Sequence, residues 1–119
     1  MNIDTLNVVK ILNEAKVEAR NSALELLNEE FGGQDSILCG FAWMEILSFN
    51  QKRIDGRSKV AKVLRKAGIE YDDYAKKFVI RDPSNLSVQN VDVKRAGAQA
   101  AANVFNKYGF TCIATSRLD

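Results

Sequence analysis

The spacing of apolar residues predicts a long first helix over Asp4 to Glu30. Asp4 or Thr5 can cap its start, and Gly32-Gly33 can end it because glycine readily takes a positive φ. Its apolar side chains recur every three or four residues, at Val8, Leu12, Ala15, Ala19, Ala23, Leu26 and Leu27.

This helix is long for a chain of 119 residues. About 26 residues give a helix of roughly 39 Å, more than a small domain needs to cover its own core. Two arrangements are open: the helix wraps its own domain, or its excess length contacts a second protomer. In the second arrangement Leu12 and Leu26 lie in an interface, and the protein is a homo-oligomer.

The rest of the sequence predicts three strands. "SILCGFAWMEIL", Ser36 to Leu47, is apolar on both faces until Glu45, which is typical of a buried central strand. Within it, Gly40 leaves one face thin enough for a helix to approach closely. The second strand covers about Lys77 to Arg81, and the third is "FTCIATS" at residues 110–116.

Two further helices separate these strands. Ser58 is a suitable N-cap for a helix whose apolar stripe ends near Gly68, which with Ile69 is typical of a Schellman stop. Asn90 or Asp92 caps another helix, which runs to about Lys107. We therefore expect a single α+β domain over residues 1–119. The helix of residues 1–31 precedes a core at 34–119, where a small three-stranded sheet carries helices mainly on one face. Strand order stays open, and parallel crossovers are allowed.

Composition narrows the class of protein. Hydrophobic residues make up 46% and charged residues 27%, as in ordinary globular domains. No run of about 18 apolar residues indicates a membrane span. The first residues lack the apolar core of a signal peptide, so we expect the cytoplasm and no membrane partner. Cys39 and Cys112 form no CxxC pair and are expected to be buried free thiols.

The chain contains no histidine. Imidazole is the commonest transition-metal ligand and the commonest general base near neutral pH. We therefore expect no metal, no cofactor and no Ser-His or Cys-His nucleophile. An enzyme would need a carboxylate pair such as Glu45 with Asp82, and the sequence gives no reason to expect one.

Charge is uneven along the chain. The first 35 residues hold seven acidic and three basic residues, whereas residues 51–66 hold seven basic residues and one acidic residue. The basic segment surrounds the start of the second predicted helix, where free backbone N–H groups favour anions. Candidate anion-binding residues are Arg53, Arg57, Ser58 and Lys59. The segment lacks the glycine spacing of a P-loop. Alternatively, Ser58 is only a cap and the basic residues are a solvated face.

Two other candidate binding residues are Arg117 and Trp43. Arg117, in "TSRLD", can present a planar fork to a carboxylate or a phosphate, and it joins the candidate anion-binding residues. Trp43 lies two residues before Glu45, so both share one face of a strand. Trp43 is expected to be a core residue or an interface anchor.

Several segments resemble a group of small proteins encoded by tailed bacteriophages. They are "CGFAWMEI", "DPSNLSVQNVD…AGAQAAANVF" and "GFTCIATSRLD". In that group a "GFAW" strand precedes a G-x-[ST]-K helix start, and the C-terminus reads "SRLD" or "SRMD". The matching positions here are Gly40 to Trp43, Gly56 with Ser58 and Lys59, and Ser116 to Asp119. The resemblance covers about residues 33–119. It implies phage origin and transfers no catalytic residues.

These observations favour a non-enzymatic phage accessory protein. We expect it to bind a host protein or a small anionic signalling molecule, in host takeover or counter-defence. The alternative is a nucleotide or nucleic-acid binder that uses the basic helix start, with an affinity that falls steeply with salt. A polynucleotide is less favoured because the net charge is only +2.

Overall fold

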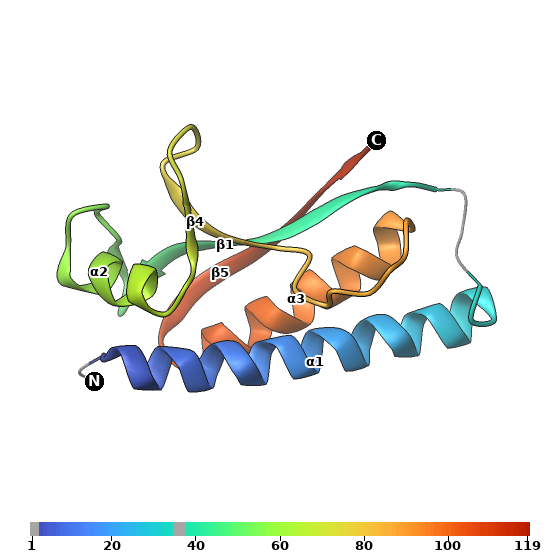
Figure 1. Cartoon of the computed structure of the whole chain (residues 1–119), viewed down its shortest axis with the longest axis horizontal. Helices are drawn as coiled ribbons and strands as arrows, with labels where there is room; N and C mark the ends of the chain where they lie inside the picture. The colour runs from blue at the N-terminus through green and yellow to red at the C-terminus, as the bar shows by residue number, and fades with distance from the viewer. Residues whose placement is uncertain (1–2, 35–37) are drawn as a thin grey trace.

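The computed structural model describes residues 3–34 and 38–119 and shows an α+β fold with a long N-terminal helix (Figure 1). The predicted class is confirmed, but the prediction of three strands is wrong because the described chain forms five. Its elements in order are α1 (Thr5–Phe31), β1 (Gly40–Phe49), β2 (Lys52–Arg53), α2 (Lys59–Lys66), β3 (Glu70–Asp72), β4 (Lys77–Arg81), α3 (Val91–Lys107) and β5 (Phe110–Leu118).

All strand pairs of the described chain are antiparallel. β1 is the central strand: β5 pairs with it on one side, and β4 and the short β2 pair with it on the other. β3 completes the sheet beside β4. The parallel crossovers that the sequence allowed are therefore not used. The predicted first strand began at Ser36, which lies outside the described residues.

The helices lie on one side of the sheet (Figure 1). α3 packs against β1 and β5, and α1 packs along α3. The core between them contains buried side chains from every helix and from the central strands, including Val8, Met44, Ile46, Leu64, Phe78, Phe105 and Phe110.

Burial alternates along β1. Ala42, Met44 and Ile46 are buried beneath the helices, whereas Phe41 is exposed and Trp43 is half-buried on the opposite side. The prediction of a strand buried on both faces is therefore wrong. Apolar residues occupy both faces, but the described helices cover only one of them. We call the uncovered side the outer face.

α1 wraps its own domain. Its 27 residues, roughly 40 Å of helix, nearly span the 44 Å long axis of the molecule. Leu12 is only 8% exposed, and Leu26 packs against a second cluster in the same chain. These contacts leave Leu12 little surface for a partner. No helix within residues 3–34 or 38–119 is both long and apolar enough to cross a bilayer.

The predicted helix starts are confirmed by their capping hydrogen bonds. Asp4 accepts from the Asn7 backbone N–H at 2.8 Å, and Ser58 accepts from Ala61 N–H at 3.1 Å. Asn90 starts α3 in the same way. Each bond satisfies a backbone donor that has no partner within its helix.

Candidate functional site

Residues at the start of α2 form hydrogen bonds with one another. The Ser58 hydroxyl accepts from Ala61 N–H and donates to the Asp55 carbonyl at 2.7 Å. The Asp55 carboxylate accepts from the Arg57 backbone N–H at 2.8 Å. Local groups thus already use the Ser58 hydroxyl and the backbone N–H groups of Arg57 and Ala61, and a carboxylate lies beside them. Arg57 and Lys59 are exposed around this cap.

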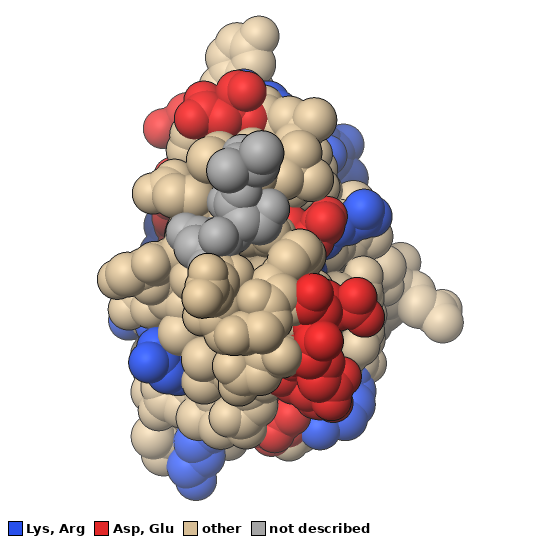
Figure 2. Space-filling model, turned by 90° about the vertical axis from the view of Figure 1, so that its right-hand side faces the viewer, with Lys and Arg blue, Asp and Glu red and all other residues tan. Residues whose placement is uncertain are grey.

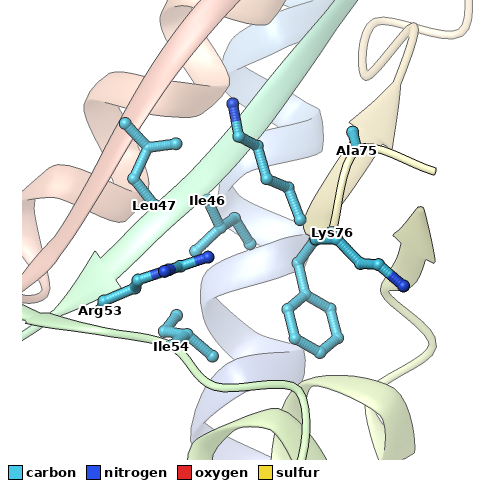
Figure 3. Close-up of a pocket in the computed structure, with 8 residues that line it drawn as sticks. Ile46, Leu47, Arg53, Ile54, Ala75 and Lys76 are labelled. Atoms are coloured by element: carbon cyan, nitrogen blue, oxygen red, sulfur yellow. The ribbon is translucent and has the colours of Figure 1, made fainter. Parts of the chain in front are cut away.

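Arg53 lines two pockets, one of them together with Asp55 and Gly56 just before α2. In the other, Ile46, Leu47 and Ile54 form part of the wall, and Arg53 points in among them (Figure 3). The Lys76 side chain, from the turn between β3 and β4, extends away from Arg53 in the same view (Figure 3). The charges of Arg53 and Lys76 therefore do not converge on one point in this pocket.

Arg117 lies far from the other four candidate anion-binding residues. On β1, its pairing partner is Phe41, whereas the partner of Arg53 is Ser48. Those two positions are roughly 23 Å apart along a strand. Arg117 therefore cannot act with the start of α2 on one small ligand.

The uneven charge of the sequence is also uneven in space. α2, with its basic residues, lies at one end of the long axis, and the C-terminal end of α1 lies at the other (Figure 1). That second end carries exposed Glu25, Glu29 and Glu30. Figure 2 views it directly and shows acidic side chains gathered in a stripe, with Lys and Arg side chains scattered around it.

The outer face brings distant segments of the sequence together. Phe41 and Trp43 of β1 pair with Arg117 and Thr115 of β5. On the other side of β1, the Asp82 backbone N–H donates to the Ala42 carbonyl at 3.0 Å. The segments "GFAW", "DPSN" and "SRLD" are therefore neighbours in the fold.

A hollow of about 610 Å³ lies on this face. We call it the outer hollow. Its walls come from β1, β4, β5, the β3–β4 turn and the start of α3, and they are lined by Phe41, Ala42, Trp43, Glu45, Asp72, Tyr74, Ala75, Val79, Arg81, Asp82, Lys94 and Arg117.

Two groups of charges within the outer hollow are already paired. Glu45 accepts from the Trp43 indole Nε1 at 3.0 Å and forms a 3.2 Å ion pair with Lys77. Arg81 binds Glu70 at 3.1 Å and Asp72 at 3.2 Å. The bond from Arg81 to Glu70 raises the pKa of the Arg81 guanidinium. The pKa of Asp72 is lowered, chiefly by the backbone N–H of Ala75.

Two cations at the rim of the hollow are not paired in this way. The Lys94 amino group and the Arg117 guanidinium lie 5.8 Å and 5.5 Å from the centre of the Phe41 ring. Neither cation forms an ion pair with a carboxylate of the described residues. Phe41 itself is 47% exposed. The Lys94 amino group also donates to the Gly40 carbonyl oxygen at 3.0 Å, which leaves its positive charge uncompensated. An exposed ring beside two cations that have no carboxylate partner in the described chain is suited to an apolar group that also carries negative charge.

Some of the exposed apolar residues lie at this hollow. Of the seven exposed large hydrophobic residues of the described chain, Phe41 and Tyr74 line the outer hollow, and Ile113 is paired with Glu45 on the same face of the sheet. The other four lie elsewhere: Leu6, Val17, Leu38 and Leu118.

Gly40 makes the close packing behind Phe41 possible. A Cβ atom at this position would lie 2.5 Å from the Arg117 carbonyl oxygen and 2.7 Å from Cγ2 of Val91, at the start of α3. The close helix approach expected at Gly40 is therefore confirmed. The absence of a side chain at Gly40 lets β1, β5 and α3 pack together directly under the exposed Phe41 ring.

Sequence reasoning identified Trp43 and Arg117 but missed Phe41 and Lys94. The available signal was the alternation of Phe41, Trp43 and Glu45 along one strand, which places a carboxylate on the same face as two aromatic rings. Lys94 carried no signal, because its role depends on where α3 crosses the sheet.

The carboxylate pair considered for an enzyme, Glu45 and Asp82, does line the same hollow. However, Glu45 is held by Lys77 and Trp43, and Asp82 accepts from the Ser84 hydroxyl at 3.1 Å. Among the residues that the structure describes, no three His, Cys, Asp or Glu side chains are grouped to hold a metal ion.

In comparisons with known proteins, no family model, no curated protein and no solved structure matched this chain.

Proposed function

We propose that this protein is a non-enzymatic binding protein that holds a segment of another protein on its outer face. The segment carries an apolar side chain next to a carboxylate. One observation carries the proposal: the exposed Phe41 ring lies within 6 Å of two cations, Lys94 and Arg117, that have no carboxylate partner among the described residues.

The chemistry of the outer hollow suits a protein partner. Aromatic residues and arginine are enriched in protein interfaces, where a few of them supply most of the binding energy. Here Phe41, Trp43 and Tyr74 line one hollow together with Arg117. Grouped exposed apolar residues of this kind are typical of an interaction surface.

A polynucleotide suits the same surface less well. Glu45, Asp72 and Asp82 line the hollow and would repel a chain of phosphates. The Trp43 indole N–H is bound to Glu45, which holds the ring in place on the strand. Nucleic-acid platforms instead combine stacking rings with a predominantly basic groove.

The bacteriophage resemblance extends this proposal to the source of the partner. A small phage protein without catalytic groups would act by occupying a surface of a host protein. We therefore propose a host protein as the partner, met in the host cytoplasm.

A selection from a displayed random-peptide library on the immobilised protein tests the proposal. The recovered peptides should share an apolar residue beside Asp or Glu. They should bind Arg117→Glu and Phe41→Ala at least tenfold more weakly than the parent, since hot-spot losses of about 1.4 kcal/mol or more are expected.

Lys59→Glu is the matched control, because it reverses one exposed positive charge at the start of α2 instead of on the outer face. It should bind the selected peptides as the parent does. Peptides without an acidic residue, or equal loss of binding in Lys59→Glu and Arg117→Glu, would contradict the proposal.

A further inference from the structure

The free side of β5 offers a second kind of interaction, which concerns the edge of the sheet and is independent of the proposed function. β5 has nine residues and pairs only with β1 among the described strands. Backbone groups along a strand point alternately to its two sides. Half of the N–H and C=O groups of β5 therefore face away from β1.

The hydrogen bonds of β1 show which residues of β5 direct their backbone groups to the free edge. The Ala42 carbonyl accepts from Asp82 on the β4 side of β1, so the even-numbered residues in this part of β1 point away from β5. Ala42 is paired with Ser116, and Met44 with Ala114. These residues form the widely spaced pairs of the ladder, so the backbone groups of Ala114 and Ser116 point to the free edge.

Asn106 confirms this assignment and closes one end of the edge. Its amide oxygen accepts from the Cys112 N–H at 2.7 Å, and its amide nitrogen donates to the Cys112 carbonyl at 3.4 Å. The side chain thus pairs with Cys112 as a residue of a neighbouring strand would. No corresponding bond is present at Ala114, Ser116 or Leu118 within the described chain.

The path of α3 explains why only the Cys112 end of the free β5 edge is covered. Asn106 is near the C-terminal end of α3, beyond the free edge of β5. At the other end of the helix, Asn90 forms a bridge with Cys39, and the adjacent Gln89 accepts from Gly40 N–H on the β4 side of β1. α3 therefore crosses beneath the sheet diagonally and leaves residues 114–118 of the edge uncovered.

We infer that two copies of this chain pair through this open edge and form one continuous antiparallel sheet. In the matching register, Ser116 of one copy lies opposite Ser116 of the second copy, and Ala114 lies opposite Leu118 in both directions. This register uses all three open residues, and each pair exchanges two hydrogen bonds. A shift by two residues would place Leu118 opposite Cys112, whose backbone groups Asn106 already occupies.

Side chains fit this register. Arg117 lies opposite Thr115 of the second copy, so like charges do not face each other directly. Leu118, which is 60% exposed in the single chain, lies beside Ala114 of the second copy and loses exposed apolar surface. The open segment lacks lysine, proline and bulges, three features by which proteins protect an edge strand, and Arg117 is its one charged residue.

A matched pair of variants tests this inference by sedimentation equilibrium of the full chain. Ser116→Pro removes an N–H from the free edge without removing a bond to β1, and proline is tolerated at such edge positions. Ser116→Ala keeps the N–H. The parent and Ser116→Ala should sediment with twice the mass of one chain, and Ser116→Pro with the mass of one chain.

Amide hydrogen exchange of the parent gives a second test that does not require a variant to fold. In the dimer, the backbone amides of Ala114 and Ser116 should exchange as slowly as those of Ile113 and Thr115. Dilution to the monomer should speed exchange only at Ala114 and Ser116. A parent that stays monomeric at millimolar concentration, an undiminished dimer in folded Ser116→Pro, or unprotected Ala114 and Ser116 amides in a dimer would overturn the inference.

Discussion

The Arg117 guanidinium lies 5.5 Å from the centre of the Phe41 ring, across the β1–β5 pair at the far end of the sheet from α2. The contact joins the start of the central strand to the end of the edge strand. It also places a cation and an exposed ring on the one face of the sheet that the described helices do not cover. The proposed function depends on this arrangement rather than on the basic start of α2.

Gly40→Ala should destabilise the fold by about 1–3 kcal/mol, the range for overpacking a filled site. The added Cβ would meet the Arg117 carbonyl at 2.5 Å, and backbone atoms cannot move aside cheaply. Gly56→Ala is the control, since its Cβ would meet no backbone atom and only the end of the Tyr71 side chain, with the hydroxyl oxygen at 3.2 Å. Urea unfolding followed by circular dichroism measures both. Equal midpoints for the two variants would argue against the close contact.

Glu45→Ala should cost more stability than Glu70→Ala. The Glu45 side chain is only 13% exposed, and its loss leaves the Trp43 N–H and Lys77 without their acceptor. A cost of about 1–3 kcal/mol is expected for such a group. Glu70 is 52% exposed in its pair with Arg81, for which about 0–1 kcal/mol is typical. Unfolding midpoints compare the two, and a larger loss for Glu70→Ala would contradict the expectation.

Some elements of the fold could be predicted from the sequence, and others could not. Asp4, Ser58 and Asn90 were predicted as caps and are observed as caps, because a cap depends on residues only three positions away. β2 and β3 were missed because two or three residues are too few to show a period. The length of α1 was ambiguous, since sequence does not reveal that the domain is elongated.

The candidate site was less predictable than the fold. Sequence reasoning placed the anion-binding site at the start of α2, where the basic residues are dense, but Asp55 and Ser58 close that cap locally. The outer face depends on the antiparallel register that brings Phe41 to Arg117. That register is a long-range property, and the apolar pattern of β1 did not show which face the helices would leave open.

Acid should weaken the contact between α1 and the end of α3. Glu14 accepts from Lys107 Nζ and from the Tyr108 hydroxyl, both at 2.7 Å, and these bonds lower the pKa of Glu14, with Lys107 as the larger cause. A lowered folded-state pKa gives stability that is complete above the unfolded-state pKa and is lost as pH falls through the folded-state value. The pKa values of Lys107 and Tyr108 are raised by the same bonds, so their contribution is lost as pH rises through the folded-state values.

Unfolding midpoints measured from neutral to acid pH check this. The parent should be more stable than Glu14→Gln at neutral pH, and the gap should close below the pKa of Glu14. Glu29→Gln, at an exposed position on the same helix, should show no such closing gap. A constant difference between the parent and Glu14→Gln would exclude the linkage.

The two cysteines should differ in reactivity. Both are free thiols, but Cys112 is 5% exposed, and burial raises its pKa to about 12. Since the thiolate is the reactive form, Cys112 should resist labelling in the native protein, while half-buried Cys39 reacts first. Thiol titration of Cys39→Ser and Cys112→Ser, before and after denaturation, measures this. Rapid native labelling of Cys39→Ser would show that Cys112 is accessible.

The indole N–H resonance of Trp43 tests the proposed function most directly, because the chain has one tryptophan and it lines the outer hollow. An NMR titration should compare a library-selected acidic peptide with an oligothymidylate. The account predicts a saturable shift of this resonance with the peptide and little shift with the oligonucleotide. In Arg117→Glu, the same shift should require at least tenfold more peptide. Peptide binding that leaves the Trp43 resonance in place, or a larger shift with the oligonucleotide, would contradict it.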